Sequence, residues 1–307
     1  MYKIHCLNPI APAGLALLTD KYELTDDISD ADAVLVRSAD MHELEVPEKL
    51  KAVARAGAGV NNIPLKAYAE RGIAVFNTPG ANANAVKELV ICALMLAARD
   101  IAGGIAWCAH NANDPQIAKA AEKTKKQFAG VEIAGKTLGV VGLGAIGKLV
   151  AQTVPALGMR VVGYDPYVTP EAAVEEMPEM EYVATLEELY AQADFITIHV
   201  PATADTIGML NTDAFDHMKP DVAILNFSRG TLVNDDDMRV ALEDGHVRIY
   251  ITDFANPAVM KMPHTVVIPH LGASTVQAEE NCAKMAVREL MEYLETGKKT
   301  HCVNETF

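Results

Sequence analysis

Residues 138–147 read Leu138-Gly139-Val140-Val141-Gly142-Leu143-Gly144-Ala145-Ile146-Gly147, an apolar run that ends in the spacing G-x-G-x-x-G. A helical pattern over 148–157 follows it directly. A strand, a glycine turn and a helix in this order are typical of a dinucleotide-binding α/β domain. Gly142 permits the tight turn, Gly144 lets the backbone approach a pyrophosphate, and Gly147 lets the helix pack closely on the strand.

A carboxylate in the right place identifies the dinucleotide. The next expected strand, Arg160–Tyr164, ends at Asp165, and Pro166-Tyr167 follow without an arginine. A carboxylate there accepts hydrogen bonds from ribose hydroxyls and repels a 2′-phosphate, which favours NAD over NADP. A chance acid after an ordinary glycine turn is the alternative, but it does not explain the ordered strand, loop, helix and acid.

Strand signals continue on both sides of this motif, separated mostly by helix-length segments. In the second half of the chain we expect strands at Thr137–Gly142, Arg160–Tyr164, Phe195–Val200, Val222–Asn226, Arg248–Thr252 and Thr265–Ile268. In the first half, apolar runs occur at Ala33–Val36, Leu50–Ala56 and Ile73–Phe76. Strands this apolar, without polar alternation, are typical of parallel sheets covered on both faces, so we predict an α/β protein.

Two long helices are also expected. The segment Asn84 to His110 is helical with a broad apolar face, which indicates burial between domains or subunits, and we expect Gly103-Gly104 to break it. The segment Ala273–Thr296 predicts a long amphipathic helix close to the end of the chain.

Composition and charge restrict the partners. The 307 residues include 26 Lys and Arg against 41 Asp and Glu, a net charge of −15 with His neutral. Such an acidic protein is a poor general partner for nucleic acid or anionic membranes. An anionic substrate therefore needs a local group of cations.

Cysteines and apolar runs indicate the compartment. The five cysteines are scattered without a C-x-x-C pair, which predicts reduced thiols in the cytoplasm and no zinc site. The N-terminus lacks the apolar core of a signal peptide. The longest apolar run, Leu89 to Ala98, is far shorter than the ~20 residues that span a bilayer. We expect a soluble cytoplasmic protein.

Four further segments carry a family resemblance. They are Arg55-Ala56-Gly57-Ala58-Gly59-Val60-Asn61-Asn62-Ile63, Asn77-Thr78-Pro79-Gly80-Ala81-Asn82, Asn226-Phe227-Ser228-Arg229-Gly230 and Pro269-His270-Leu271-Gly272-Ala273-Ser274-Thr275. With the glycine-rich turn between them, the whole chain resembles the D-isomer-specific 2-hydroxyacid dehydrogenases. Within that family it is most similar to the short form of the D-3-phosphoglycerate dehydrogenases.

The resemblance implies two Rossmann-like or flavodoxin-like domains with parallel sheets, the nucleotide domain being inserted into the substrate domain. Residues 1–96 and 286–307 would form the substrate domain, and residues 97–285 would form the NAD-binding domain. Hinge closure of the cleft between them would exclude water. Family likeness and the apolar stretch Leu89 to Cys108 also predict a homodimer.

The same resemblance names three catalytic residues. Arg229 would hold the substrate carboxylate and polarise the carbonyl that forms at C2. His270 would take the C2 hydroxyl proton as the hydride leaves. The family places a glutamate beside this histidine, whereas this chain has Asn256. Asn256 can orient the ring but cannot stabilise an imidazolium by charge, so we expect turnover to shift to a different pH.

The remaining site residues divide between cofactor and substrate. Predicted cofactor contacts are Gly142, Gly144, Ala145, Ile146, Gly147, Asp165, Val200, Pro201, Phe227, Asp253 and Gly272. Predicted substrate contacts are Arg37, Ser38, Ala58, Gly59, Val60, Asn82 and Lys87. The Gly57–Val60 loop can present consecutive amides to a carboxylate, or it can be an ordinary turn, and Lys87 can equally be a solvated surface cation.

These residues favour NAD-dependent oxidation of 3-phospho-D-glycerate to 3-phosphohydroxypyruvate, the entry to serine synthesis. One alternative is a dehydrogenase for an unphosphorylated D-2-hydroxy acid such as glycerate or lactate. A second alternative is a non-catalytic NAD sensor, which the missing glutamate favours and which Arg229 and His270 oppose. The expected partners are a small anionic 2-hydroxy acid and a second copy of the chain, without a metal.

Overall fold

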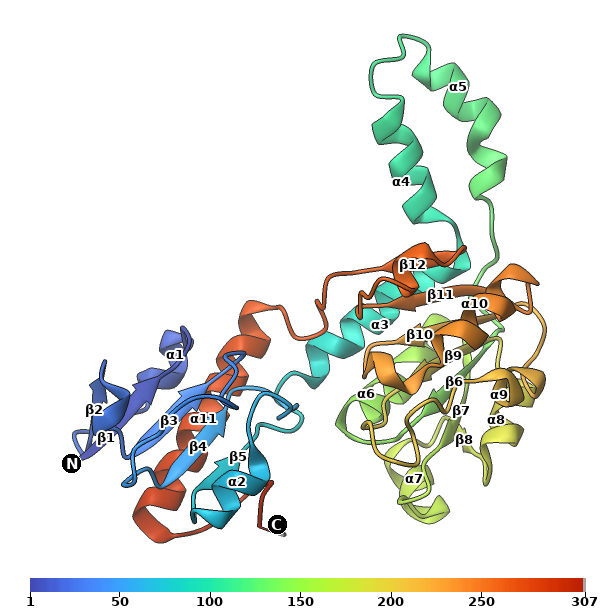
Figure 1. The fold of residues 1–307 in the computed structure, drawn as a ribbon. Coiled ribbons are helices and arrows are strands. Elements are labelled where there is room, and N and C mark those ends of the chain that lie inside the picture. The colour runs from blue at the N-terminus through green and yellow to red at the C-terminus, as the bar shows by residue number, and fades with distance from the viewer. Residues whose placement is uncertain (306–307) are drawn as a thin grey trace. The chain divides into compact units, whose positions relative to one another are not determined.

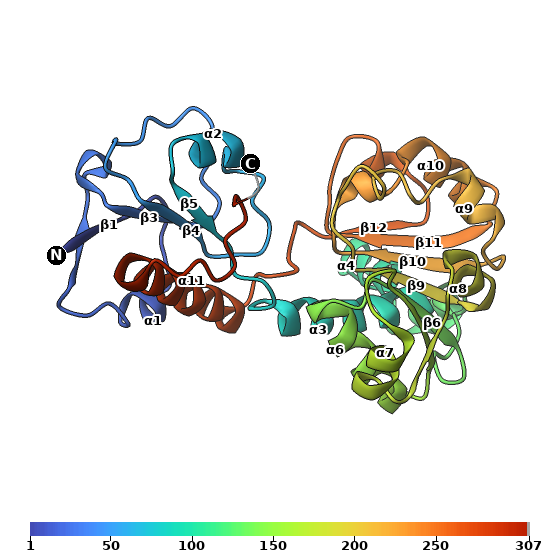
Figure 2. The ribbon, with the colours of Figure 1, turned by 90° about the horizontal axis from the view of Figure 1, so that it is seen from below.

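A computed structural model describes residues 1–305 as two compact units, each built around one parallel sheet (Figures 1 and 2). The discontinuous unit comprises Met1–Ala85 and the chain from Ala273 onward, and the central unit comprises Val86–Gly272. The predicted α/β class with parallel sheets is confirmed. The units divide at 85/86 and 272/273, which is eleven and thirteen residues before the boundaries that we expected at 96/97 and 285/286.

The central unit contains a seven-stranded sheet in the order β12-β11-β10-β9-β6-β7-β8. The strands are β6 (Thr137–Val141), β7 (Arg160–Tyr164), β8 (Met180–Tyr182), β9 (Phe195–Ile198), β10 (Val222–Asn226), β11 (Val247–Thr252) and β12 (Thr265–Val267). All six predicted strands are present, and β8 was missed because three residues, one of them charged, give no strand signal. The order reverses beside β6, which is where ligands of such sheets bind.

Helices cover both faces of this sheet (Figure 2). They are α3 (Ala83–Ala98), α6 (Ala145–Thr153), α7 (Pro170–Glu176), α8 (Leu186–Gln192), α9 (Thr212–Asp216) and α10 (Asp235–Glu243). Val90, Leu94 and Val150, from α3 and α6, pack in one hydrophobic cluster with Leu138 and Val140. The cores of α8, α9 and α10 pack on the opposite face. Helices therefore cover both faces of the sheet with apolar side chains, as strands that are apolar on both faces require.

The predicted helix over 84–110 is broken at a different place. Helix α3 ends at Ala98, and α4 (Ile101–His110) leaves it at an angle of 73°. The Asp100 carboxylate caps α4 by accepting a hydrogen bond from the Gly103 N–H at 2.8 Å. The expected break at Gly103-Gly104 was therefore wrong, because the Asp100 cap begins a new helix that contains both glycines.

A helical hairpin follows this bend and projects from the sheet (Figure 1). It consists of α4, α5 (Ile117–Thr124) and the 3₁₀ turn η2 (Lys125–Phe128). Among residues 1–305, no single helix is long and apolar enough to cross a membrane, although the bent pair α3 and α4 passes that test of length and composition together.

The discontinuous unit contains a five-stranded parallel sheet in the order β2-β1-β3-β4-β5. The strands are β1 (Tyr2–Cys6), β2 (Tyr22–Thr25), β3 (Ala33–Val36), β4 (Ala52–Arg55) and β5 (Ala74–Phe76). The predicted C-terminal helix is α11 (Val276–Thr296), which the Thr275 hydroxyl caps. It lies with α1 (Pro12–Leu15) along one face of the sheet, and α2 (Leu65–Glu70) covers the other (Figure 2).

Candidate active site

The glycine-rich turn of the central unit has the geometry that its sequence predicts. Gly142 adopts a φ of 92°, and a Cβ atom there would lie 2.8 Å from the His199 carbonyl oxygen. A Cβ on Gly147 would collide with the Gly142 carbonyl oxygen. A Cβ on Gly144 would meet nothing within 4 Å, so exposed backbone faces open space at the start of α6. The turn therefore suits a pyrophosphate at a helix N-terminus.

Asp165 holds this turn from the neighbouring strand. One carboxylate oxygen accepts a hydrogen bond from the Leu143 N–H at 2.8 Å, and the other accepts one from the Tyr167 N–H at 2.9 Å. The carboxylate thus lies at the carboxyl end of β7 beside the glycine-rich turn, where a ribose is expected. Val200 and Pro201 follow β9, which pairs with β6 on the side away from β7.

Arg229 lies on a loop that a buried asparagine fixes. Asn226 ends β10 with no exposed surface, and its amide group donates to the Arg229 carbonyl oxygen at 2.9 Å. The Asn226 side-chain oxygen accepts from the Ser228 N–H at 3.1 Å, and the Ser228 hydroxyl donates to the Ile198 carbonyl oxygen at 2.8 Å. Arg229 is half-buried at the edge of the sheet where substrates of this architecture bind.

His270 lies on the loop after β12 in a conformation that few side chains adopt. Its φ is 45°, in the left-handed region. Its N–H donates to the carbonyl oxygens of Asp253 and Ile268, both at 3.0 Å. The ring centroid lies 5.1 Å from that of Phe254, and the residue is exposed. Hydrogen bonds of its own N–H therefore hold His270 in a strained backbone conformation that leaves the imidazole accessible. Strained backbone of this kind is frequent at functional sites.

Asp253 is a buried carboxylate that connects the two loops. It is 2% exposed, and one oxygen accepts from the Gly272 N–H at 3.0 Å. Among the described residues, the other oxygen is buried without a hydrogen-bond partner. Burial raises the pKa of Asp253, whereas the Gly272 N–H and the charges of His270 and Arg229 oppose this rise. An unpaired acceptor here fits a ligand that brings an amide N–H, such as a nicotinamide carboxamide.

Asn256 does not orient His270, so this part of the predicted triad is corrected. The Asn256 amide group donates to the Asp235 carboxylate at 2.9 Å. Its oxygen accepts from the N–H groups of Ala258 and Val259, at 2.8 and 2.9 Å, directly before and at the start of the 3₁₀ turn η5 (Val259–Lys261). Asparagine side chains commonly bond to nearby backbone in this way.

The predicted anion-binding residues of the discontinuous unit gather at the carboxyl ends of β3 and β4. The Arg37, Ser38 and Ala39 N–H groups all donate to the Asn8 side-chain oxygen, at 3.1, 3.0 and 2.9 Å. The Arg37 guanidinium forms an ion pair with Glu279 of α11, with 2.6 Å between Nη2 and Oε1. Arg37 therefore lies just after the carboxyl end of β3, and part of its guanidinium already binds a carboxylate of the same unit.

The Gly57–Val60 loop lies beside a second arginine that sequence reasoning missed. Arg55 Nε donates to the Arg37 carbonyl oxygen at 3.1 Å, and a Cβ on Gly57 would collide with the Arg55 guanidinium. Burial raises the pKa of Cys282, and the Thr78 side chain and the charges of Arg55 and Arg37 oppose this rise. The available signal was an arginine immediately before a glycine loop at a strand end. Two guanidinium groups therefore lie near the predicted anion loop.

The other predicted substrate residues are separated between the units. Asn82 belongs to the discontinuous unit, and Lys87 lies in the first turns of α3 in the central unit, partly buried. Ala58 is exposed, and the Asn77 amide donates to its carbonyl oxygen at 2.6 Å. Asn77 thus fixes the shape of the loop that carries Ala58, Gly59 and Val60.

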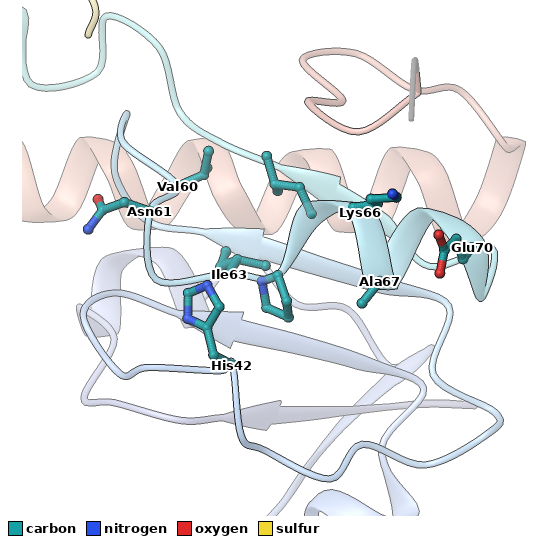
Figure 3. Close-up of a pocket in the computed structure, with 9 residues that line it drawn as sticks. His42, Val60, Asn61, Ile63, Lys66, Ala67 and Glu70 are labelled. Atoms are coloured by element: carbon teal, nitrogen blue, oxygen red, sulfur yellow. The ribbon is translucent and has the colours of Figure 1, made fainter. Parts of the chain in front are cut away.

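A separate cavity of about 810 Å³ opens on the discontinuous unit (Figure 3). It is lined by His42, Val60, Asn61, Ile63, Pro64, Leu65, Lys66, Ala67 and Glu70. Val60 is the one lining residue that also belongs to the predicted anion loop. Lys66 and Glu70 place one positive and one negative side chain in the wall of the cavity. We assign this cavity no part in the reaction.

The comparisons with known proteins show the family and the fold. Residues 92–272 match the family model described as D-isomer specific 2-hydroxyacid dehydrogenase, NAD binding domain. A curated D-3-phosphoglycerate dehydrogenase from Mycobacterium tuberculosis is 38% identical over 293 residues, which are 89% of this chain and 53% of that protein. One from Methanocaldococcus jannaschii is 35% identical, over 98% of this chain and 57% of that protein. The chain thus spans about half the length of the curated relatives that it matches.

Solved structures extend the likeness over the full chain. The NAD⁺-bound 3-phosphoglycerate dehydrogenase of Entamoeba histolytica superposes with a TM-score of 0.80 and 26% identity, covering 100% of this chain and 99% of that one. A D-2-hydroxyisocaproate dehydrogenase superposes with a TM-score of 0.79 at 21% identity, over 99% of this chain and 100% of that one, and shows the fold alone.

Proposed function

Because the chain belongs to the D-isomer-specific 2-hydroxyacid dehydrogenase family, we propose that it oxidises 3-phospho-D-glycerate to 3-phosphohydroxypyruvate with NAD. This reaction would make it the entry enzyme of serine synthesis. The observation that carries the proposal is the arrangement of Arg229, Asp253 and His270 on three loops at the same edge of the central sheet.

Each of these residues has a chemical task. Arg229 binds the substrate carboxylate with its planar fork and polarises the C2 oxygen as the carbonyl forms. His270 accepts the proton of the C2 hydroxyl. Bound NAD would supply the hydride acceptor for C2, and the products would then be the 2-oxo acid, NADH and a proton. The glycine-rich turn and Asp165 would hold the pyrophosphate and ribose, and the open acceptor of Asp253 would hold the carboxamide.

The phosphate would be bound by the arginines of the discontinuous unit. Phosphate prefers clustered guanidinium groups because they form paired, charge-assisted hydrogen bonds. Arg37 and Arg55 supply such a cluster in a chain whose net charge is −15. The ion pair of Arg37 with Glu279 favours the alternative substrate, an unphosphorylated D-2-hydroxy acid, because the phosphate must compete with a carboxylate.

We expect Arg37→Ala to raise KM for 3-phospho-D-glycerate about tenfold without changing KM for D-glycerate, since one charge-assisted pair contributes about 1.4 kcal/mol or more. Steady-state kinetics with both acids measures this. Lys21→Ala is the matched control, because Lys21 also loses an ion pair, with Glu295 at 2.7 Å, on the same unit. An equal rise in KM for both acids would place Arg37 at the carboxylate instead.

Turnover itself separates an enzyme from a sensor. We expect NADH to form when the protein is mixed with NAD and 3-phospho-D-glycerate. Tight NADH binding without turnover on any D-2-hydroxy or 2-oxo acid would favour a non-catalytic NAD sensor.

We also propose a cytoplasmic homodimer. All five cysteines are free thiols, as the reducing cytoplasm requires. The hairpin of α4 and α5 presents an apolar groove of about 420 Å³ lined by Ile101, Gly104, Ile105, Trp107, Cys108, Ala121, Lys125 and Phe128. No residue of α4 is buried, and Ile105 is 65% exposed. Apolar surface of this kind is usual at subunit contacts.

Ile105→Glu tests the dimer. We expect this change to convert a dimer into a monomer in analytical ultracentrifugation, because it places a charge in the middle of an apolar contact. Val240→Glu on α10 is the control, since Val240 is 50% exposed in the same unit and lies outside the hairpin. A wild-type monomer, or a dimer that persists in Ile105→Glu, would contradict the assignment.

A further inference from the structure

A buried tyrosine lies beneath the loops that carry the candidate catalytic groups. Tyr250, in the middle of β11, is 1% exposed. Its neighbours Asn226 and Thr252, at the ends of β10 and β11, have no exposed surface. Burying a hydroxyl is unfavourable unless it is hydrogen-bonded, and phenylalanine would fill the same space without that cost. We therefore expect the hydroxyl to form a contact that a phenylalanine could not provide.

One side of the Tyr250 hydroxyl faces the Arg229 loop. The Asn226 amide group donates to the Tyr250 oxygen at 3.3 Å and to the Arg229 carbonyl oxygen at 2.9 Å. The same Asn226 side chain accepts from the Ser228 N–H. Tyr250 thus holds the side chain that shapes the loop before and at Arg229.

The strand that carries Tyr250 runs directly into the loop of Asp253 and Phe254. Thr252 lies two residues after Tyr250 on the same face of β11, and its side-chain oxygen accepts a hydrogen bond from the Phe254 N–H at 3.1 Å. The Asp253 carbonyl oxygen in turn accepts from the His270 N–H, and the Phe254 ring packs against the His270 ring. A Cβ on Gly230, next to Arg229, would lie 3.2 Å from the Phe254 Cβ, so the two loops touch.

We propose that Tyr250 is a positioning residue that fixes the Arg229 loop and the Asp253–Phe254 loop relative to each other. Its effect on activity rests on the proposed dehydrogenase function. The guanidinium of Arg229 and the imidazole of His270, whose N–H bonds to the Asp253 carbonyl oxygen, must both reach one carbon and tolerate little displacement, since errors of about 1 Å can cost up to about a hundredfold in rate. Tyr250 touches neither substrate nor cofactor in this account.

Tyr250→Phe removes the hydroxyl and keeps the ring. We expect kcat/KM for the hydroxy acid to fall about tenfold, whereas the Kd of NADH should change much less, because the glycine-rich turn lies on other strands and only the Asp253 contact belongs to the affected loop. The matched control is Tyr190→Phe in α8. Tyr190 is 3% exposed in the same hydrophobic cluster, and among the described residues its hydroxyl has no hydrogen-bond partner. Its removal should change neither kcat/KM nor Kd.

Amide hydrogen exchange tests the position independently of activity. The Ser228 N–H bonds to the Asn226 side chain, which donates to the Tyr250 oxygen, so Tyr250→Phe should accelerate exchange of this amide and Tyr190→Phe should not. Unchanged exchange at Ser228, or a normal kcat/KM for Tyr250→Phe, would overturn the inference. Lack of turnover by the wild-type protein would instead overturn the proposed function, and faster exchange would still support the positioning role.

Discussion

Replacement of His270 by asparagine is expected to lower kcat for 3-phospho-D-glycerate oxidation by about 10²- to 10⁴-fold, the usual contribution of a positioned general base. Asparagine is the appropriate change because His270 has a φ of 45°, a conformation that asparagine adopts more easily than most residues. The backbone hydrogen bonds to Asp253 and Ile268 can therefore persist. The variant removes the proton acceptor without rebuilding the loop.

The measurement is steady-state kinetics together with NADH binding by fluorescence. NADH affinity should be unchanged, since the pyrophosphate turn does not depend on the imidazole. His217→Ala is the control, because His217 is an exposed histidine of the same unit whose ring bonds only to a nearby backbone oxygen among the described residues. Near-normal kcat for His270→Asn would mean that another group takes the proton.

The second large effect is expected at Arg229. Arg229→Lys keeps the positive charge but loses the planar fork that binds a carboxylate through two parallel hydrogen bonds. We expect kcat/KM to fall about 10²- to 10³-fold, as when a preorganised donor to a developing oxyanion is removed. KM should rise and kcat should fall, because the guanidinium acts on both bound substrate and the transition state.

Arg239→Ala supplies the comparison for Arg229. Arg239 is an exposed arginine of α10 in the same unit, bonded to Glu243 one turn away, and its loss should leave the kinetics unchanged. If Arg229→Lys retained full activity, the carboxylate would have to be held elsewhere.

The parts of the fold that were predictable are those with local causes. The glycine-rich turn needs Gly142 at a positive φ and Gly147 against a carbonyl oxygen, and these requirements lie within ten residues of sequence. Apolar strands of four to six residues were similarly clear. The break in the first long helix was misplaced because the side-chain cap of Asp100 outweighs the low helix propensity of Gly103 and Gly104.

The parts that were not predictable depend on pairs far apart in the chain. Arg37 and Glu279 are separated by 242 residues, and Asn256 and Asp235 by 21. Neither pair leaves a pattern in one segment, so Arg37 was predicted only as a substrate contact and Asn256 as a partner of His270. Tyr250 was missed for the same reason, since a tyrosine in an apolar strand resembles any other core residue until Asn226 is placed beside it.

The central claim concerns the substrate, and one comparison tests it most directly. With saturating NAD, kcat/KM should be at least about a hundredfold higher for 3-phospho-D-glycerate than for D-glycerate, because the arginines of the discontinuous unit add charge-assisted contacts only to the phosphate. Equal values of kcat/KM for the two acids would contradict the assignment and leave a D-2-hydroxyacid dehydrogenase for an unphosphorylated substrate.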